Sequence, residues 1–330
     1  MKSAQMKNIL RKNTITFILL IMVVLLAVFA RGFLSVNNLL SILRSMAIIG
    51  VAAFGMTMVI IGGEIDLSIG STIGLSAVLT AWVAKQLQGA LGADWAVIIG
   101  MAVAILAAAL VGLFNGFIRV RFNIPSFIIT LAMLNVLYGL AAILSSGFPI
   151  TISAQWFNVI GAGRIIKTGG FSGLPVASIW LVLIFLIVFV VMNRTRFGRE
   201  VYAVGGNQEA SRLSGVNIAK VKIITMVVSQ VTAAISGIIL ASQVLSGSPQ
   251  FGRGYETDVI SAVIIGGASL SGGLGRTTGT LFGILFLGVI LNGMTLLGVD
   301  DYVKYVVRGS LILLAVILNT IQTQKARHTL

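Results

Sequence analysis

Long stretches of the chain carry no charged side chain. Ten uncharged runs of 16 to 42 residues follow one another, from 13–30 near the start to 309–324 near the end. A helix needs roughly 20 residues to cross the hydrocarbon core of a bilayer, so the runs have the lengths that crossings require. They predict an all-α integral membrane protein with about ten transmembrane helices, at 14–31, 39–62, 67–86, 95–118, 125–145, 176–193, 221–245, 257–270, 277–298 and 303–321.

The runs are not typical of a transmembrane β-barrel. Barrel strands alternate apolar and polar residues over segments of about ten, and stretches such as 179–192 do not alternate. A helix also satisfies its own backbone polar groups in lipid. Composition agrees with a membrane protein: 57% of the residues are hydrophobic, 10% are charged and the mean hydropathy is +1.05, whereas soluble domains carry about 25% charged residues.

Basic residues are distributed unevenly between the two sides of this layout. With the chain starting inside, fifteen Lys and Arg fall on the inner side and six on the outer side, which is the bias of cytoplasmic loops. Both termini are therefore predicted to be cytoplasmic, within a single transmembrane domain over 1–330. The net charge of +14 is interpreted as orienting charge and not as a nucleic-acid surface, so no nucleic acid partner is expected.

Two further features limit the chemistry of the chain. It has no cysteine and one histidine, His328, so disulfides and thiolate metal sites are excluded and no metal site is predicted. Four basic residues precede the first apolar run, which is also typical of a signal peptide. No small-residue cleavage site follows that run, so we expect an uncleaved first helix.

Two long connections separate the predicted helices. The outer one, 146–175, contains two prolines and several glycines, so it is predicted to be a turn-rich periplasmic loop and not a further crossing. The inner one, 194–220, is predicted to be a cytoplasmic loop with a short surface helix: Asn207 is a candidate N-cap, Glu209 lies in its first turn and Gly215 ends it. We interpret this helix as a docking element for another protein, although any loop of this length needs capped turns.

The stretch GGEIDLSIGS at 62–71 places two carboxylates, Glu64 and Asp66, at the junction of the second and third predicted helices. Carboxylates at this depth are costly unless they face water, a partner or a helix N-terminus. Asp66 is interpreted as an N-cap of the third helix, supported by Ser68. For Glu64 three interpretations stay open: a position on a solute pathway, a pair with a basic group, or solvation in the loop.

A second glycine-rich stretch, GGASLSGGLGRTTGT at 266–280, has five glycines in its first ten residues. Such density predicts a broken or re-entrant segment, which is tolerated at membrane depth only where it is buried in protein or lines a cavity. The spacing of its Gly and Ser residues is similar to that in 62–71 and suggests an internal repeat.

Several polar side chains lie inside otherwise apolar helices. Asn115, Asn135, Gln230 and Asn292 are able either to hydrogen-bond a polyhydroxylated solute or to hold helices together. Arg308 lies near an outer helix end, where we expect its side chain to reach the interface. The sequence contains no GxxxxGK[ST] phosphate loop, and no His, Cys or metal-ligand cluster lies in a predicted helix. Neither an ATPase site nor catalytic residues are therefore predicted in this chain.

Six segments carry a family signature: VNNLLSIL (36–43), GMTMVIIGGEIDLSIGS (55–71), PSFIITLAML (125–134), TRFGREVYAVGGNQEASRLSGVN (195–217), YETDVISAVIIGGASLSGGLGRTTGTLFG (255–283) and NGMTLLGV (292–299). In these segments the chain resembles the ribose-type monosaccharide ABC transporter permeases, a branch of the family that also holds branched-chain amino acid permeases. The segments run through most of the chain. One departure is Glu64, where many relatives have glycine, and it bears on which sugar is handled.

The resemblance implies the permease subunit of an ATP-binding-cassette importer in the bacterial inner membrane, which translocates a monosaccharide by alternating access. The implied partners are separate ATPase subunits that bind the ATP and Mg, a periplasmic sugar-binding protein, and a second permease copy, identical or a close paralogue. The inner loop then resembles the coupling helix on which the ATPases push, through Arg199, Asn207, Glu209, Ala210, Arg212 and Gly215. Candidate residues of the translocation path are Glu64, Asp66, Asn115, Asn135 and Asn292.

Three other functions are alternatives to a sugar importer. An ion-driven carrier needs ionisable residues at the bilayer midplane, and most of the nine acidic residues lie near predicted helix ends. A membrane-embedded enzyme needs side chains that run chemistry, and the helices lack them. The same importer class with a non-sugar solute stays open, because a separate binding protein can select the solute.

Overall fold

The computed structural model describes residues 14–168 and 172–327, which form a bundle of α-helices with very short strands. The helices of the bundle are α2 (Thr14–Phe29), α3 (Val36–Ile61), α4 (Ile69–Leu91), α5 (Ala93–Phe122), α6 (Ser126–Ser145), α8 (Val176–Arg194), α11 (Ile218–Val244), α12 (Tyr255–Ile265), α13 (Thr277–Leu296) and α14 (Asp301–Arg327). The connections hold β1 (Ile150–Thr151), η1 (Gln155–Phe157), α7 (Asn158–Ala162), β2 (Arg164–Ile165), β3 (Leu174–Pro175), α9 (Arg196–Gly206), α10 (Gln208–Leu213) and β4 (Ser246–Gly247).

Six helices in the described part of the chain are long and apolar enough to cross a membrane, namely α3, α5, α6, α8, α11 and α13. Helix α2 is shorter, with 16 residues. Helices α4, with 23 residues, and α14, with 27, are long but are not among the six. The number of ten crossings therefore stays a prediction.

The helix predicted at 257–270 is wrong as a continuous crossing. Helix α12 has 11 residues, which is about 16 Å of helix and roughly half of a bilayer core. The residues before it run in turns beside α4, where Gly74 lies against the carbonyl of Phe251 and Gly70 against the carbonyl of Gly252. This segment is therefore half irregular and half helical, and its irregular half is packed against protein, as non-helical backbone at membrane depth must be.

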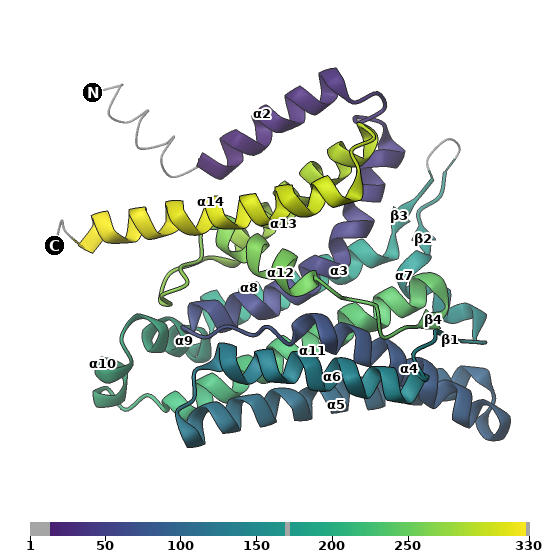
Figure 1. Ribbon diagram of the computed structural model, residues 1–330, viewed down its shortest axis with the longest axis horizontal. Coiled ribbons are helices and arrows are strands. Elements are labelled where there is room, and N and C mark those ends of the chain that lie inside the picture. Colours follow the sequence, from purple (N-terminus) through teal and green to yellow (C-terminus); the bar gives the residue numbers. More distant parts are fainter. Residues whose placement is uncertain (1–13, 169–171, 328–330) are drawn as a thin grey trace.

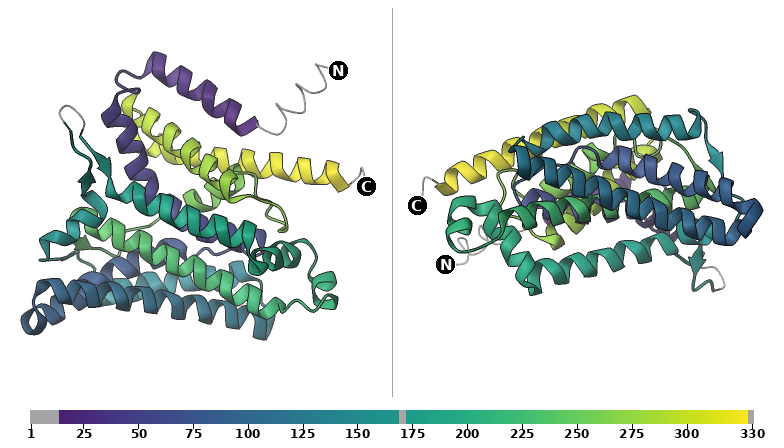
Figure 2. Two further views of the ribbon diagram at one scale, coloured as in Figure 1. Left: turned by 180° about the vertical axis from the view of Figure 1, so that it is seen from behind. Right: turned by 90° about the horizontal axis from the view of Figure 1, so that it is seen from below.

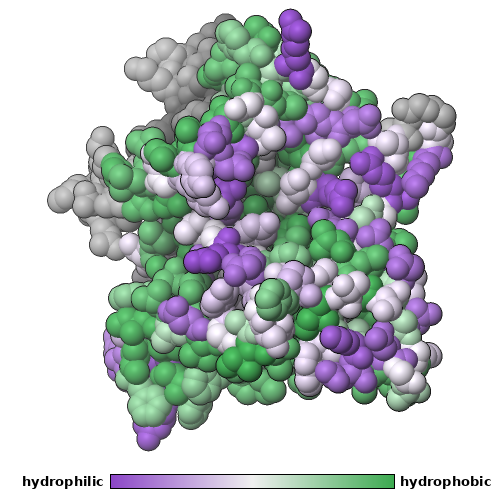
Figure 3. Space-filling model, turned by 45° about the vertical axis from the view of Figure 1, so that its right-hand side comes forward, coloured by the Kyte–Doolittle hydropathy of each residue, from purple (hydrophilic) through white to green (hydrophobic). Residues whose placement is uncertain are grey.

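Helices α3 and α11 form the centre of the bundle (Figures 1 and 2). Helix α3 contacts α8, α11, α12 and α13, and α11 also contacts α4 and α5. Both central helices are mostly buried, whereas less than a third of the apolar stretch of α5, α6 and α8 is buried, and these helices expose large apolar residues such as Leu110, Ile143 and Leu186. Figure 3 shows apolar side chains over much of one face, with a band of polar residues across it. An apolar outer surface is what surrounding lipid requires.

Small residues bring α5 and α11 into backbone contact. Gly112 and Gly116 face α11, and a Cβ at either position would overlap the backbone of that helix. This four-residue spacing of small residues is typical of close helix pairs in membranes. The contact positions the last turn of α5, which carries Arg119, beside the second turn of α11, which carries Lys222.

The two ends of the bundle differ. At one end, β1 pairs antiparallel with β4, with Ile150 opposite Gly247, and β2 pairs antiparallel with β3, with Arg164 opposite Pro175. At the other end lie α9, α10, the start of α2 and the end of α14 (Figure 1). We name these the β end and the α10 end. The connections predicted to face opposite sides of the membrane, 146–175 and 194–220, therefore lie at opposite ends of the bundle.

Candidate functional site

Helix α10 is a short capped helix that projects from the bundle. The side chain of Asn207 accepts a hydrogen bond from the backbone N–H of Ala210 at 3.0 Å, so the predicted N-cap is confirmed. Glu209 and Arg212 form an exposed ion pair at 2.6 Å. The helix ends at Leu213, two residues before Gly215, which has a φ of +78°. Since these charged side chains are exposed, they are available to another protein.

Helix α9 is a second helix in a connection for which the sequence predicts only one short helix, because charged residues interrupt its apolar pattern. Its signal in the sequence is the pair Val201 and Val204, three residues apart, which are both fully buried. Tyr202 donates a hydrogen bond from its hydroxyl to the carbonyl of Gly275 at 3.0 Å. Arg199 lies on the exposed side of the helix. Helix α9 is thus packed against the bundle while α10 extends from it.

The carboxyl end of α9 meets two other segments through glycine backbone. Gly205 packs so closely that a Cβ there would overlap the carbonyl oxygen of Ile61 and the backbone nitrogen of Gly273. The N–H of Gly273 donates to the carbonyl of Ile61 at 2.8 Å. Gly272 and Gly273 have φ values of +81° and +73°, which favour glycine. We name Gly63, Gly205, Gly272 and Gly273 the glycine junction, and the two glycine-rich stretches compared in the sequence meet there.

Glu64 follows the glycine junction and is the centre of an ion cluster with Arg119 and Lys222. The Nε of Arg119 lies 2.9 Å from both carboxylate oxygens of Glu64, and the Nζ of Lys222 lies 2.7 Å from Oε1. Lys222 also donates to Oε1 of Gln208 at 3.1 Å. Glu64 is 4% exposed. Of the three interpretations left open for Glu64, solvation in the loop is wrong and pairing with a basic group is confirmed.

The electrostatics of the ion cluster depend on all of its members. Burial raises the pKa of Glu64, but hydrogen bonds from Arg119 and Lys222 and the charge of Lys222 outweigh it, so the pKa lies below its ordinary value. Glu64 is therefore ionised, and the cluster carries one negative and two positive charges. Removing one member of a buried ion pair leaves its partner desolvated and uncompensated, which is strongly destabilising.

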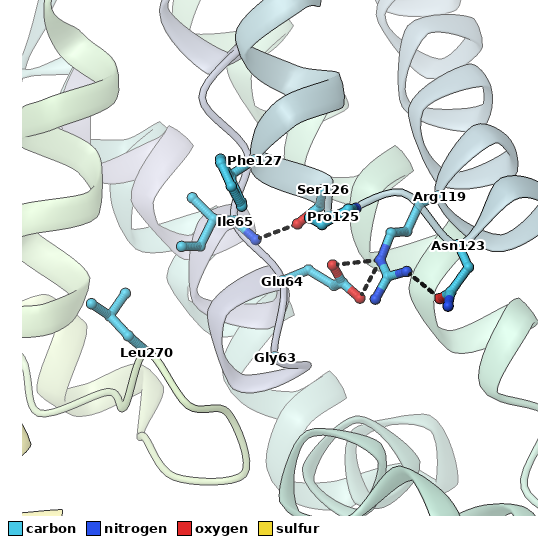
Figure 4. Close-up of a pocket in the computed structure, with 9 residues that line it drawn as sticks. All are labelled: Gly63, Glu64, Ile65, Arg119, Asn123, Pro125, Ser126, Phe127 and Leu270. Carbon is cyan, nitrogen blue, oxygen red and sulfur yellow. Dashed lines mark hydrogen bonds and ion pairs between the residues drawn. The ribbon is translucent and has the colours of Figure 1, made fainter.

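A cavity of about 360 Å³ opens beside the ion cluster (Figure 4). In the close-up, Glu64 and Arg119 point toward each other on one side, and Leu270 lies across from them. The walls come from the α3–α4 connection, the corner between α5 and α6, and the connection after α12. The lining residues are Gly63, Glu64, Ile65, Arg119, Asn123, Pro125, Ser126, Phe127 and Leu270.

Asp66 lies in a second polar group at the start of α4, where its carboxylate accepts a backbone N–H as an N-cap side chain does. The N-cap residue of α4 is Ser68, while Asp66 is fully buried and accepts four hydrogen bonds. The backbone N–H and hydroxyl of Ser68 donate at 3.0 and 2.6 Å, the hydroxyl of Ser229 at 3.0 Å and the amide of Gln230 at 2.6 Å. Asn115 of α5 donates to the hydroxyl of Ser68 at 3.4 Å. This Asp66 network holds the start of α4 against α11 and α5.

The other predicted polar residues lie elsewhere. Asn135 is exposed on α6 and donates to the carbonyl of Leu131. Asn292 and Asn38 exchange two amide hydrogen bonds, at 2.8 and 2.9 Å, which tie α13 to α3. Arg308 pairs with buried Asp258 at 3.3 Å. Of the five path candidates, the structure brings only the two in the Asp66 network into one hydrogen-bonded group.

The arrangement at the α10 end is suited to transmitting displacement. Helix α9 is fixed to the glycine junction through backbone, and α10 reaches the ion cluster through Gln208 and Lys222. A movement of this pair of helices therefore acts on the α3–α4 connection at two neighbouring positions, Gly63 and Glu64. Within 14–168 and 172–327, no group of three or more His, Cys, Asp or Glu side chains is placed to hold a metal ion.

Comparison with known proteins gives a consistent result. The sequence model of the family described as "Branched-chain amino acid transport system / permease component" matches residues 38–316. The ribose import permease protein of Bacillus subtilis (strain 168) is 40% identical over 91% of this chain and 90% of that protein. The ribose import permease protein of Escherichia coli (strain K12) is 36% identical over 91% of each. The L-arabinose transport system permease protein of the same strain is 38% identical over 92% of this chain and 88% of that protein. No solved structure matches the chain significantly.

Proposed function

This chain belongs to the family of transport-system permease components whose model matches residues 38–316, and we propose that it is the membrane-spanning subunit of an ATP-binding-cassette importer for a monosaccharide, a ribose-like pentose or a hexose. The observation that carries the proposal is an identity of 36 to 40% to ribose and arabinose permeases over 91 to 92% of the chain. Six apolar helices of membrane-spanning length agree with a multi-pass protein of the bacterial inner membrane.

We propose that the α10 end faces the cytoplasm and that the chain crosses ten times, with both termini inside. Basic residues gather at the α10 end, as cytoplasmic segments require: Arg119, Arg194, Arg199, Lys220 and Lys222 all come from elements that end or begin there. The segment from β4 through α12 supports the eighth crossing, because it runs from the β end to the glycine junction. The connection 146–175 is then periplasmic.

In the proposed mechanism, separate subunits bind ATP, deliver the sugar and form the pathway. ATP and Mg bind ATPase partners in the cytoplasm, and those partners contact the exposed surface of α10, which includes Glu209, Arg212 and Leu213. A periplasmic binding protein delivers the sugar at the β end, and a second permease copy completes the pathway. Displacement of α10 reaches the membrane-spanning helices through the glycine junction and the ion cluster, and this alternates access between the two sides.

A second candidate is an importer of the same class for a branched-chain amino acid. The description of the matching family supports it, since that description names this solute. The more similar relatives are ribose and arabinose permeases, which favours sugar. An ion-driven carrier is disfavoured because the buried carboxylates of the described residues are engaged: Asp66 accepts four hydrogen bonds, and Glu64 and Asp258 pair with basic side chains.

The proposed orientation is tested with single cysteines, since the chain has none of its own. Leu213→Cys places a thiol on α10, where the side chain is 80% exposed, and Phe148→Cys places one at the β end, where it is 74% exposed. We expect a membrane-impermeant maleimide to label Phe148→Cys in intact cells and Leu213→Cys only in inverted vesicles. Labelling of Leu213→Cys from outside intact cells would refute the orientation.

The proposed transport is tested in proteoliposomes that contain this chain with its copurified ATPase and binding protein. We expect uptake of labelled ribose, arabinose or another monosaccharide that requires ATP and the binding protein, and no uptake of labelled leucine. Vesicles that hold this chain alone serve as the control. Accumulation against a gradient by the chain alone, or ATP-driven uptake of leucine in place of sugar, would contradict the proposal.

A further inference from the structure

Glu64 receives contacts from two other segments of the chain and is linked to a third through Lys222. It lies in the connection between α3 and α4, while Arg119 comes from the last turn of α5 and Lys222 from the second turn of α11. The Lys222 ammonium also binds Gln208, the first residue of α10, at 3.1 Å. One carboxylate therefore connects the α3–α4 connection, α5, α11 and, through Lys222, α10.

The ion cluster is shielded from water. The Glu64 side chain is 3% exposed, that of Lys222 6% and that of Arg119 15%. Charges interact more strongly when water is excluded, and each charge in such a cluster depends on its partners. Lys222 has two acceptors, Glu64 and the neutral amide of Gln208. A displacement of α10 takes away the second acceptor and changes how the ammonium is held against Glu64.

Glu64 and Arg119 of the cluster line one wall of the cavity at the α10 end. The α3–α4 connection is fastened to the corner between α5 and α6 by the Glu64–Arg119 pair and by a hydrogen bond from the backbone N–H of Ile65 to the hydroxyl of Ser126 at 3.0 Å. Figure 4 shows both contacts on the same wall of the cavity. A solute that leaves through this end needs the wall to separate, and separation breaks the contacts of Glu64.

We propose that Glu64 is a positioning residue that acts as a latch between α10 and the cytoplasmic end of the pathway. While α10 is seated on Lys222, the ion cluster holds the α3–α4 connection against α5; when α10 is displaced, the cluster opens and the connection is released. This inference rests on the proposed function, because it assigns the latch to the step that couples ATP hydrolysis to transport.

The first test replaces Glu64 by glutamine, which keeps the size of the side chain and one acceptor oxygen but replaces the other oxygen by a donor NH2 group and removes the charge. Uptake per ATP hydrolysed is measured in proteoliposomes that contain the whole importer. We expect Glu64→Gln to lower this ratio by about fivefold or more, within the usual range of coupling between sites. The matched control is Glu200→Gln on α9, where the carboxylate pairs with exposed Arg196 at 2.8 Å, and its ratio stays at the wild-type value.

The outcomes separate the latch from the proposed function and from folding. If the wild-type importer shows no ATP-driven uptake, the proposed function is refuted. If the wild-type importer transports and Glu64→Gln leaves the uptake per ATP hydrolysed unchanged, only the latch is refuted. A merely structural role lowers the amount of protein in the membrane and its melting temperature but not the uptake per ATP hydrolysed by the protein that remains. A reduced ratio at normal melting temperature therefore supports the latch.

The second test leaves the ion cluster in place. Because the chain has no cysteine, Ile65→Cys together with Ser126→Cys introduces one pair of thiols across the wall that the cluster holds together. A short bifunctional thiol reagent is applied to the importer without nucleotide and after trapping with ATP and vanadate. We expect the yield of cross-linked chain to differ by about fivefold or more between the two states. Equal yields would show that the two positions do not separate, and the latch would be wrong.

Discussion

Replacement of Gly205 by alanine tests whether α9 is fixed to the membrane-spanning helices at the glycine junction. The added Cβ would overlap the carbonyl oxygen of Ile61 and the backbone nitrogen of Gly273. Both atoms belong to backbone, so no side-chain rotation relieves the overlap. Either α9 moves away from α3, or the hydrogen bond from Gly273 to Ile61, which is 2.8 Å long, is broken.

The size of the effect follows from three contributions. Overpacking costs about 1–3 kcal/mol, and loss of the hydrogen bond adds about 0.5–1.5 kcal/mol if it breaks. Alanine recovers about 0.5–1 kcal/mol through its better helix propensity. We therefore expect Gly205→Ala to lower the free energy of unfolding by about 2 kcal/mol, which for a chain of 330 residues corresponds to a fall in melting temperature of roughly 3 °C.

The matched control is the neighbouring residue on the same helix. A Cβ on Gly206 would meet only the Cα of Gly273, at 4.0 Å, so Gly206→Ala gains helix propensity without a clash and leaves the melting temperature unchanged or slightly higher. Both variants are purified in the same detergent and unfolded by heat at one scan rate, since the melting temperature of a protein that unfolds irreversibly depends on the scan rate. Equal melting temperatures for the two variants would refute this account of the junction.

Three further predictions concern the polar groups. Asn207→Ala removes the N-cap of α10 and costs that helix about 1 kcal/mol, so we expect weaker ATP-driven uptake, whereas Asn207→Asp keeps the cap; equal uptake by both variants would contradict this. Asp66→Ala leaves four buried donors without their acceptor and lowers the free energy of unfolding by about 3 kcal/mol or more, which thermal unfolding measures against wild type; an unchanged melting temperature would argue against the Asp66 network. Asn292→Ala loses two amide hydrogen bonds and about 1–2 kcal/mol, while Asn135→Ala on the exposed face of α6 changes stability by about 0.5 kcal/mol or less, so equal melting temperatures of these two variants would count against the tie between α3 and α13.

Many helices of the fold can be predicted from the runs of the sequence that contain no charged residue. A run of uncharged apolar residues of sufficient length specifies a helix in lipid, so the helices α3, α6 and α8 begin and end close to their predicted bounds. The same rule fails for α12, because a run without charges does not distinguish helix from turns that are buried against another helix. It also misses α9, whose amphipathic pattern is short and is interrupted by charged residues.

The site was harder to predict because its contacts join distant parts of the chain. Arg119 lies 55 residues after Glu64, and local patterns specify which residues form a helix but not which helix ends meet. The N-cap of α10 was predictable, since Asn207 and Ala210 are three residues apart and their hydrogen bond needs no tertiary contact. The Asp66 network was missed for the opposite reason: its partners Ser229 and Gln230 lie on a central helix that only the packing brings near.

The order of residues in the α3–α4 connection explains how a small displacement of α10 can open one end of the bundle without disturbing its centre. Gly63 is held at the glycine junction beside α9, and Asp66 is held by α11 within the Asp66 network. Two residues, Glu64 and Ile65, lie between these fixed points. Helices α4, α5 and α11 are joined by the Asp66 network and by the backbone contact of α5 with α11, so we expect them to move as one unit. Any motion that reaches Gly63 from α9 must therefore be absorbed over these two residues, and the side chain of Glu64 is the one that α10 touches through Lys222.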